Sequence, residues 1–249
     1  MFPVIQIGSL SVQVPGLILI AGLWLGLIIA ERSSSRHGIP GNILYNLAFI
    51  FLVCGIIGAR LSYIVQYPTA FSTSPTSIVS LNPSLLDLWG GIATGFIGTL
   101  IYGSRKRLST WAILDALTPT FATVGIAVGL ANLASGNAFG TSTNVPWGIE
   151  LWGSHRHPTQ IYEVILTSLI LVIILYYDRK STDKPPGVLF LTFAALSSLA
   201  HLFQGGFRGD SNLIVGNLRT IQVIAWITLA TSLVSLGLIK KKSMIKNQP

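Results

Sequence analysis

The sequence predicts an all-α protein that crosses a membrane about seven times. Of its 249 residues, 51% are hydrophobic and only 10% are charged, with a mean hydropathy of +0.66. A soluble domain carries about a quarter charged residues. The apolar residues also occur in runs that match the roughly 20 residues a helix needs to span a bilayer. We therefore expect one integral membrane domain over residues 1–249, with the lipid bilayer as its main partner.

Seven runs of the sequence are long and apolar enough to be membrane-spanning helices. They cover approximately residues 15–30, 42–66, 85–103, 112–134, 160–177, 187–204 and 219–238. Two pairs of small residues, Gly91 with Gly95 and Gly125 with Gly129, lie four apart in the third and fourth runs. Such spacing lets neighbouring helices approach closely. Tight helix contacts are therefore expected at both pairs.

Basic residues mark alternate connections between these runs. Clusters follow the first, third, fifth and seventh runs, and no Lys or Arg precedes the first. These clusters hold 12 of the 16 basic residues: Arg32, Arg36, Arg105, Lys106, Arg107, Arg179, Lys180, Lys184, Lys240, Lys241, Lys242 and Lys246. Lys and Arg accumulate in the cytoplasmic loops of membrane proteins. The pattern predicts an odd number of spans, with the N-terminus outside and the C-terminus in the cytoplasm.

The composition argues against several other classes of protein. The net charge is +8, but the basic residues sit in short clusters between apolar runs, so we expect no nucleic-acid partner. Cys54 is the one cysteine and lies within an apolar run, which excludes a disulfide framework within the chain and a cysteine-based zinc site. We predict neither a metal site nor a cofactor.

Several polar residues are unusual for membrane helices. Arg60 lies inside the second run, where a charge at the bilayer centre costs at least about 2.5–3.5 kcal/mol. It needs a partner, a water-filled cavity or a lipid phosphate, or it extends to the interface. Asn132 and His201 serve either a binding or proton-carrying function or a structural hydrogen bond between helices. Asp87 and Asp115 lie near the ends of runs and are expected at the interface.

The long connection before the fifth run combines polar groups with a helix start. Pro158 is expected as the first helical residue, where its missing N–H does no harm. Gln160 and Glu163 then share one face of the helix, close to Arg156. A helix N-terminus attracts anions. An ordinary interfacial cap would have the same pattern, so function and capping both stay open here.

At these positions the chain resembles the bacterial prolipoprotein diacylglyceryl transferases. The shared segments follow the same order through nearly the whole sequence. They are Gly58-Ala59-Arg60, Trp89-Gly90-Gly91, Gly129–Asn132, Ser135–Gly140, Arg156–Glu163 and Phe207–Asp210. The most specific is RHPTQIYE, from Arg156 to Glu163, which is close to the family's RHPSQLYE.

The resemblance implies transfer of a diacylglyceryl group from phosphatidylglycerol to the lipobox cysteine of a preprolipoprotein, on the outer side of the bacterial inner membrane. Such a reaction needs a base for the thiol and fixed cations for the lipid phosphate. His157 or Glu163 is the implied base. The implied substrate-binding residues are Arg60, Asn132, Gly140, Arg156, Gln160, Tyr162 and Arg208.

The chain also departs from the family pattern. The residues Pro15, Trp89, Gly129, Asn137, His201 and Gly205 stand where the family has Tyr, His, Arg, Glu, Arg and Glu, respectively. An alternative interpretation is therefore a non-catalytic relative that binds lipid or a protein partner. A third is a small transporter with an ion path through Arg60 and His201, which the scarcity of paired acidic residues in the apolar runs disfavours.

Overall fold

The computed structural model describes residues 3–7, 10–72, 85–180, 184–210 and 219–246. Its long elements are all helices, and each coincides with one of the seven predicted runs. They are α1 (Val14–Ser34), α2 (Gly41–Gln66), α4 (Leu88–Arg105), α5 (Thr110–Ser135), α6 (Thr159–Lys180), α7 (Val188–Gly205) and α8 (Thr220–Lys246). The all-α prediction is confirmed.

Six of the described helices are long and apolar enough to cross a membrane, and the protein is a multi-pass membrane protein. The exception among the seven is α4, which is 18 residues long. Its sequence includes five glycines, which contribute little hydropathy. A seventh crossing by α4 therefore stays a prediction.

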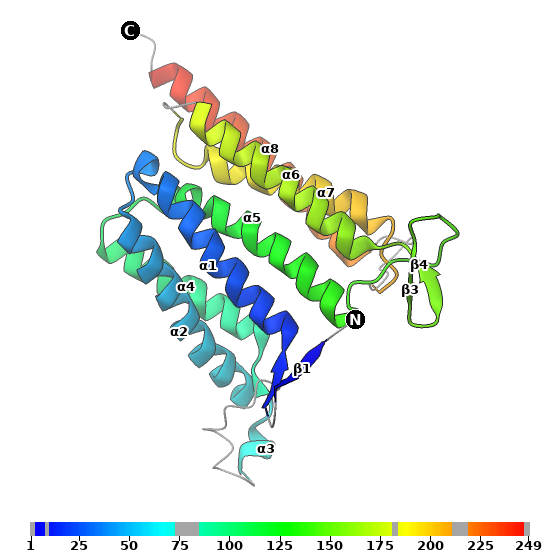
Figure 1. Ribbon diagram of the computed structural model, residues 1–249. Helices are drawn as coiled ribbons and strands as arrows, with labels where there is room; N and C mark the ends of the chain where they lie inside the picture. Colours follow the sequence, from blue (N-terminus) through cyan, green and yellow to red (C-terminus); the bar gives the residue numbers. More distant parts are fainter. Residues whose placement is uncertain (1–2, 8–9, 73–84, 181–183, 211–218, 247–249) are drawn as a thin grey trace.

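The helices form three groups (Figure 1). Helices α1 and α5 pack together along the centre, the pair α2 and α4 lies on one side, and α6, α7 and α8 lie on the other. Close packing comes from small residues: a Cβ added at Gly95 would lie 2.9 Å from the Phe51 carbonyl oxygen, and one at Gly129 would lie 2.8 Å from Val164 Cγ2. These values confirm the helix contacts predicted at both glycine pairs.

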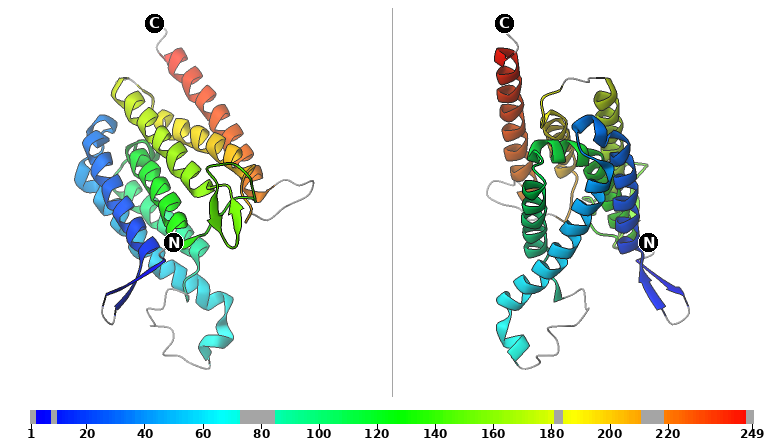
Figure 2. Two further views of the ribbon diagram at one scale, coloured as in Figure 1. Left: turned by 45° about the vertical axis from the view of Figure 1, so that its right-hand side comes forward. Right: turned by 90° about the vertical axis from the view of Figure 1, so that its left-hand side faces the viewer.

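Short elements cap the two ends of the bundle. A 3₁₀ helix, η1, covers Ser35–His37, and a single-turn helix, α3, covers Pro68–Ser72. Strands β1 (Val4–Ile7) and β2 (Leu10–Gln13) form one antiparallel hairpin. Strands β3 (Ile149–Leu151) and β4 (Ser154–Arg156) form a second. Both hairpins lie at one end, here called the hairpin end, and the C-terminus lies at the other (Figure 2).

Charged side chains join the helices at the end opposite the hairpins. Asp178 of α6 is 3% exposed and lies 2.6 Å from Arg36 NH1, 3.2 Å from His37 Nε2 and 3.8 Å from Lys184 Nζ. Burial lowers the pKa of Lys184, and the nearby carboxylates oppose that shift. This polar latch, comprising Arg36, His37, Asp178 and Lys184, fixes the end of α1 against the end of α6.

Asp115 has a structural role that sequence reasoning does not anticipate. Its side chain is buried against the start of α7. Its carboxylate oxygens accept hydrogen bonds from the backbone N–H groups of Gly187 (2.6 Å) and Phe190 (2.8 Å). The first N–H groups of a helix have no partner within the helix. Asp115 therefore caps α7 from a neighbouring helix, which the local sequence did not reveal.

Candidate functional site

The site is built where three distant segments meet at the hairpin end. The segments are the loop after α5, the start of α6 and the residues after α7. Backbone hydrogen bonds join them: Thr141 N–H donates to the Phe207 carbonyl (2.7 Å), Gly209 N–H to the Phe139 carbonyl (2.8 Å) and His157 N–H to the Thr141 carbonyl (3.1 Å). Residues that lie about 70 positions apart are thereby held in a fixed arrangement.

Gly140 is the centre of this junction. A Cβ added there would overlap the His157 carbonyl oxygen and lie 2.7 Å from the His157 Cβ. Gly209 approaches from the other side, where an added Cβ would lie 2.7 Å from the Gly140 carbonyl oxygen. The backbones are therefore too close for a side chain at position 140.

Gly140→Ala should lower the free energy of unfolding by about 1–3 kcal/mol, because the clash is with backbone that the junction holds in place. The free energy can be measured by titrating the purified protein in micelles with a denaturing detergent. The matched control is Gly237→Ala on α8, where an added Cβ meets nothing within 4 Å. Equal stability of the two variants would contradict the proposed role of Gly140.

Arg156 ties the β3–β4 hairpin to the junction. Its Nε–H donates to the Leu151 carbonyl (3.0 Å), its NH1 group donates to the Gly140 carbonyl (3.2 Å), and its guanidinium carbon lies 4.9 Å from the centre of the Phe139 ring. A guanidinium has five N–H donors. The described hydrogen bonds use two of them, so Arg156 can position the loop and also bind an anion.

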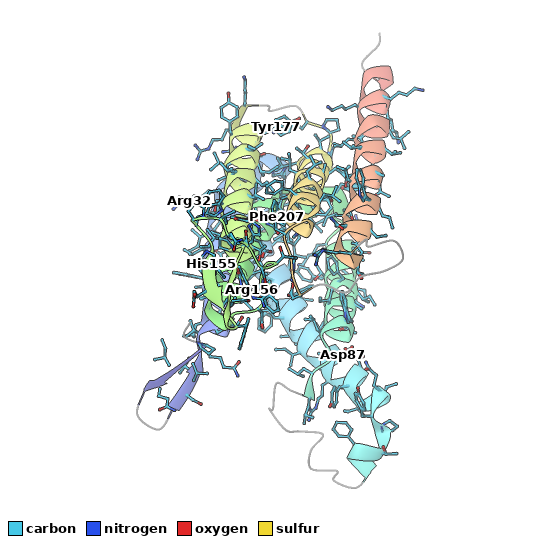
Figure 3. All side chains as sticks on the ribbon, turned by 90° about the vertical axis from the view of Figure 1, so that its right-hand side faces the viewer. Arg32, Asp87, His155, Arg156, Tyr177 and Phe207 are labelled. Atoms are coloured by element: carbon cyan, nitrogen blue, oxygen red, sulfur yellow. The ribbon has the colours of Figure 1, made fainter. Side chains whose placement is uncertain are left out.

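Arg208 belongs to the segment after α7 and pairs with the same loop through its backbone. Gly140 and Arg208 form an isolated antiparallel β-bridge. Arg208 donates two hydrogen bonds to Asp210, from Nε (2.9 Å) and NH2 (3.1 Å), and this hydrogen bonding raises the pKa of the guanidinium. Arg156 thus contacts Gly140 through its side chain, and Arg208 contacts it through the backbone. Figure 3 shows Arg156 and Phe207, the neighbour of Arg208, in the region where the hairpin meets the end of α7.

Glu163 and Asn132 complete the polar cluster. The Glu163 carboxyl group on α6 is almost fully buried, and it interacts with the Asn132 amide of α5 and with the charge of Arg208. A buried carboxylate requires such partners. Here they come from two other segments. The cluster therefore brings together three of the predicted site residues, and Arg208 connects it to Gly140.

The first turn of α6 is anchored to the loop before it. Thr159 Oγ1 donates to the Ala138 carbonyl (2.6 Å), and Gln160 Nε2 donates to the Asn137 carbonyl (2.8 Å). The helix begins at Thr159, one residue after Pro158, the predicted start. Gln160 is fully buried, yet its Oε1 has no hydrogen-bond partner among the described residues. An unpaired buried acceptor is costly and requires an explanation such as a catalytic role or a bound water molecule.

Several aromatic side chains pack together beside the polar cluster. Trp147 Nε1–H donates to the Tyr162 hydroxyl (2.8 Å), and that oxygen lies 3.3 Å from His157 Nδ1. The His157 ring also packs against Phe207, with ring centres 5.0 Å apart. His157 and Tyr162, both predicted site residues, are therefore held next to the junction by aromatic contacts.

A pocket of about 400 Å³ opens next to Asn132. Its walls come from the β1–β2 hairpin, the start of α1 and the end of α5. The lining residues are Pro3, Val4, Gln13, Pro15, Leu19, Ala131, Asn132, Ser135 and Asn137. The polar ones are neutral amides and a hydroxyl, and the others are apolar. No pattern in the sequence predicts the N-terminal hairpin, so Gln13 is a pocket residue that sequence reasoning misses.

Arg60 is placed differently from the other predicted site residues. Its NH1 group donates to the Leu85 carbonyl (2.9 Å), and its guanidinium lies 5.6 Å from the Phe71 ring centre. Nearby, hydrogen bonds from the Ser62 hydroxyl and the Gly90 N–H lower the pKa of Asp87. The described contacts thus associate Arg60 with the α2–α4 pair, whereas the polar cluster lies among α5, α6 and the segment after α7.

The structure also shows what occupies the positions that depart from the family pattern. Trp89 is 76% exposed on α4, so it does not line the cluster. The space beside Gly129 is filled by Val164 of α6. At Gly205 an added Cβ would lie 2.6 Å from Cγ and 3.1 Å from Nε2 of Gln222 on α8. Neighbouring side chains thus fill the space beside both glycines.

Comparison with known proteins supports the resemblance. A family model described as prolipoprotein diacylglyceryl transferase matches residues 3–238. Similar proteins named phosphatidylglycerol–prolipoprotein diacylglyceryl transferase occur in Clostridioides difficile (strain 630), with 29% identity over 92% of this chain and 91% of the relative, and in Finegoldia magna, with 29% over 93% and 92%. A third, from Nostoc sp. (strain PCC 7120), shares 27% identity over 94% and 87%. The chain belongs to the prolipoprotein diacylglyceryl transferase family.

Proposed function

We propose that this protein transfers a diacylglyceryl group from phosphatidylglycerol to the cysteine thiol of a preprolipoprotein lipobox. One structural observation carries the proposal: the Arg156 side chain donates to the Gly140 carbonyl, the backbone of Arg208 pairs with Gly140, and the charge of Arg208 interacts with the buried Glu163 beside Asn132. Two cations in a fixed, partly buried position suit a lipid phosphate and the negative charge that it gains as a leaving group.

The remaining predicted residues fit around this centre. We assign the glycerol headgroup to the pocket beside Asn132, because neutral amides and hydroxyls pair with alcohol groups without repelling the phosphate. Gln160, with its unpaired Oε1, and Tyr162 are assigned to the same substrate. Arg60 is assigned to lipid phosphate on the α2–α4 side. His157 and Glu163 are the proton acceptors that the sequence suggests, and no cofactor or metal is needed for the reaction.

The proposed location is the bacterial inner membrane, with the hairpin end outside. The basic clusters lie at or just beyond the C-terminal ends of α1, α4, α6 and α8, and these ends lie opposite the hairpins. Because Lys and Arg favour the cytoplasmic side, that end is assigned to the cytoplasm. The site then faces the side on which the lipobox of an exported protein emerges.

A transfer assay tests the function. Purified protein in detergent is mixed with phosphatidylglycerol carrying labelled acyl chains and with a lipobox peptide, and the Clostridioides difficile relative serves as the comparison enzyme. We expect a thioether-linked, labelled peptide, and none when the lipobox cysteine is replaced by serine. Folded protein that yields no product, while the relative does, would contradict the proposal and favour a lipid-binding or partner-binding role.

A further inference from the structure

The loop from Gly136 to Gly140 connects the two parts of the proposed substrate site. Asn137 lines the pocket assigned to the headgroup. The Gly140 carbonyl accepts a hydrogen bond from Arg156, which is assigned to the phosphate. Only two residues, at positions 138 and 139, lie between them. The conformation of this short segment therefore sets how the pocket lies relative to the arginine.

Every carbonyl group of this loop accepts a hydrogen bond from another segment. Along the chain, the five donors are Trp152 Nε1–H, Gln160 Nε2–H, the Thr159 hydroxyl, Gly209 N–H and the Arg156 guanidinium. The donor–acceptor distances are 3.0, 2.8, 2.6, 2.8 and 3.2 Å, respectively. The donors come from the β3–β4 hairpin, the start of α6 and the segment after α7. The loop is therefore held mainly by residues outside it.

Ala138 has a strained backbone within this loop. Its φ is +54°, in the left-handed region, and the residue is only 5% exposed. A residue with a Cβ is disfavoured in that region, whereas glycine adopts it freely. Such strain persists only where the surroundings hold it in place, and it is concentrated at functional sites. A specific contact must therefore keep Ala138 in this conformation.

Thr159, the first residue of α6, provides that contact. Its Oγ1 donates to the Ala138 carbonyl over 2.6 Å, which is the shortest of the five hydrogen bonds. Thr159 is 3% exposed, and the bond itself is buried. Loss of the hydroxyl would leave a buried carbonyl without its donor, which is unfavourable unless the backbone moves. The hydrogen bond therefore opposes the relaxation of Ala138.

From this arrangement we propose that Thr159 is a positioning residue for diacylglyceryl transfer. It holds Ala138 in the left-handed conformation, so that one phosphatidylglycerol molecule reaches the headgroup pocket and Arg156 at the same time. The inference rests on the proposed function and specifies how two parts of the site act on one lipid. Thr159 touches neither the lipid nor the thiol and acts through the Ala138 carbonyl.

The test measures transfer kinetics for Thr159→Val, in which a methyl group replaces the hydroxyl. The KM for phosphatidylglycerol, expressed as its mole fraction in the micelles, should rise about 10–100-fold, because a displacement of about 1 Å suffices for an effect of that size. The KM for the lipobox peptide should stay unchanged. Thr159→Ser, which keeps the hydroxyl, should keep the wild-type values. Thr159→Ala is the second variant without a hydroxyl, for use if Thr159→Val does not fold.

A second substitution tests the link to Ala138. Glycine adopts a positive φ without strain, so Ala138→Gly should change the kinetics little on its own. Combined with Thr159→Val, it should recover most of the loss, because the loop no longer needs the hydrogen bond to keep its conformation. Such non-additivity is the signature of two residues that act through one contact.

The outcomes separate this inference from the proposed function. An unchanged KM for phosphatidylglycerol in Thr159→Val, with or without a lower unfolding temperature, would mean that Thr159 is only structural. A loss that Ala138→Gly does not reduce would mean that Thr159 does not act through the loop. Either result overturns the inference while the transferase stands. If wild type transfers nothing, the proposed function fails and the inference fails with it.

Discussion

Arg208→Gln is expected to lower the rate of diacylglyceryl transfer about 100–1,000-fold, the usual effect of removing one fixed donor from a site where negative charge develops. Arg208 bridges to Gly140, pairs with Asp210 and interacts with the buried Glu163. Glutamine keeps part of the volume and loses the charge. The measurement is the initial rate with labelled phosphatidylglycerol and a lipobox peptide, at equal amounts of membrane-inserted protein.

Two further variants test whether the effect of Arg208 comes from its charge alone, from the shape of its guanidinium, or from its location in the protein. Arg208→Lys keeps the positive charge but loses the planar fork that matches a phosphate, so its rate should fall between wild type and Arg208→Gln. Arg32→Gln removes an exposed cation from the last turn of α1, at the end of that helix away from the hairpins (Figure 1), and should leave the rate unchanged. A normal rate for Arg208→Gln would remove Arg208 from the site.

The helices were predictable because the bilayer imposes a strong constraint on sequence. A spanning helix must satisfy its backbone hydrogen bonds internally and present apolar side chains over about 20 residues. Those requirements leave a signal that is local in the chain. Helix contacts at small residues were predictable for the same reason. Gly125 and Gly129 lie on one face of α5, and an added Cβ at either would meet α6 within 3 Å.

The assembly of the site was only partly predictable. The segment from Arg156 to Glu163 is continuous, so its turn and helix start could be inferred from Pro158. The pairing of Gly140 with Arg208 depends on backbone hydrogen bonds between segments about 70 residues apart, and it has no local signal. The capping role of Asp115 has no local signal for the same reason, because the N–H groups that it caps belong to another helix.

The structure also bears on the residues that depart from the family pattern. Val164 lies in the space beside Gly129, and Gln222 lies in the space beside Gly205. An arginine at 129 or a glutamate at 205 would therefore collide with a neighbouring helix as this chain is packed. Neighbouring side chains thus occupy the space that the larger residues of the family would need at these two positions.

Asp178→Ala is expected to have the largest effect on stability, a loss of about 3–5 kcal/mol in the free energy of unfolding. The carboxylate lies 2.6 Å from Arg36 and is also near His37 and Lys184, and all but Arg36 are largely buried. Its removal leaves these cations close together in a poorly hydrated place without a counter-charge. The measurement is reversible unfolding in mixed micelles, followed by the loss of helical signal.

The matched control is Glu31→Ala, which removes an exposed acid from the same end of the bundle. Glu31 accepts one hydrogen bond from the Tyr45 hydroxyl (2.6 Å), so its loss should cost only about 1 kcal/mol. The polar latch and the proposed site lie at opposite ends of α6, so Asp178→Ala should keep the transfer rate per folded molecule. Stability within about 1 kcal/mol of wild type would show that Asp178 is not required to hold α1 against α6. A transfer rate that falls although the protein remains folded would show instead that the two ends of the bundle are coupled.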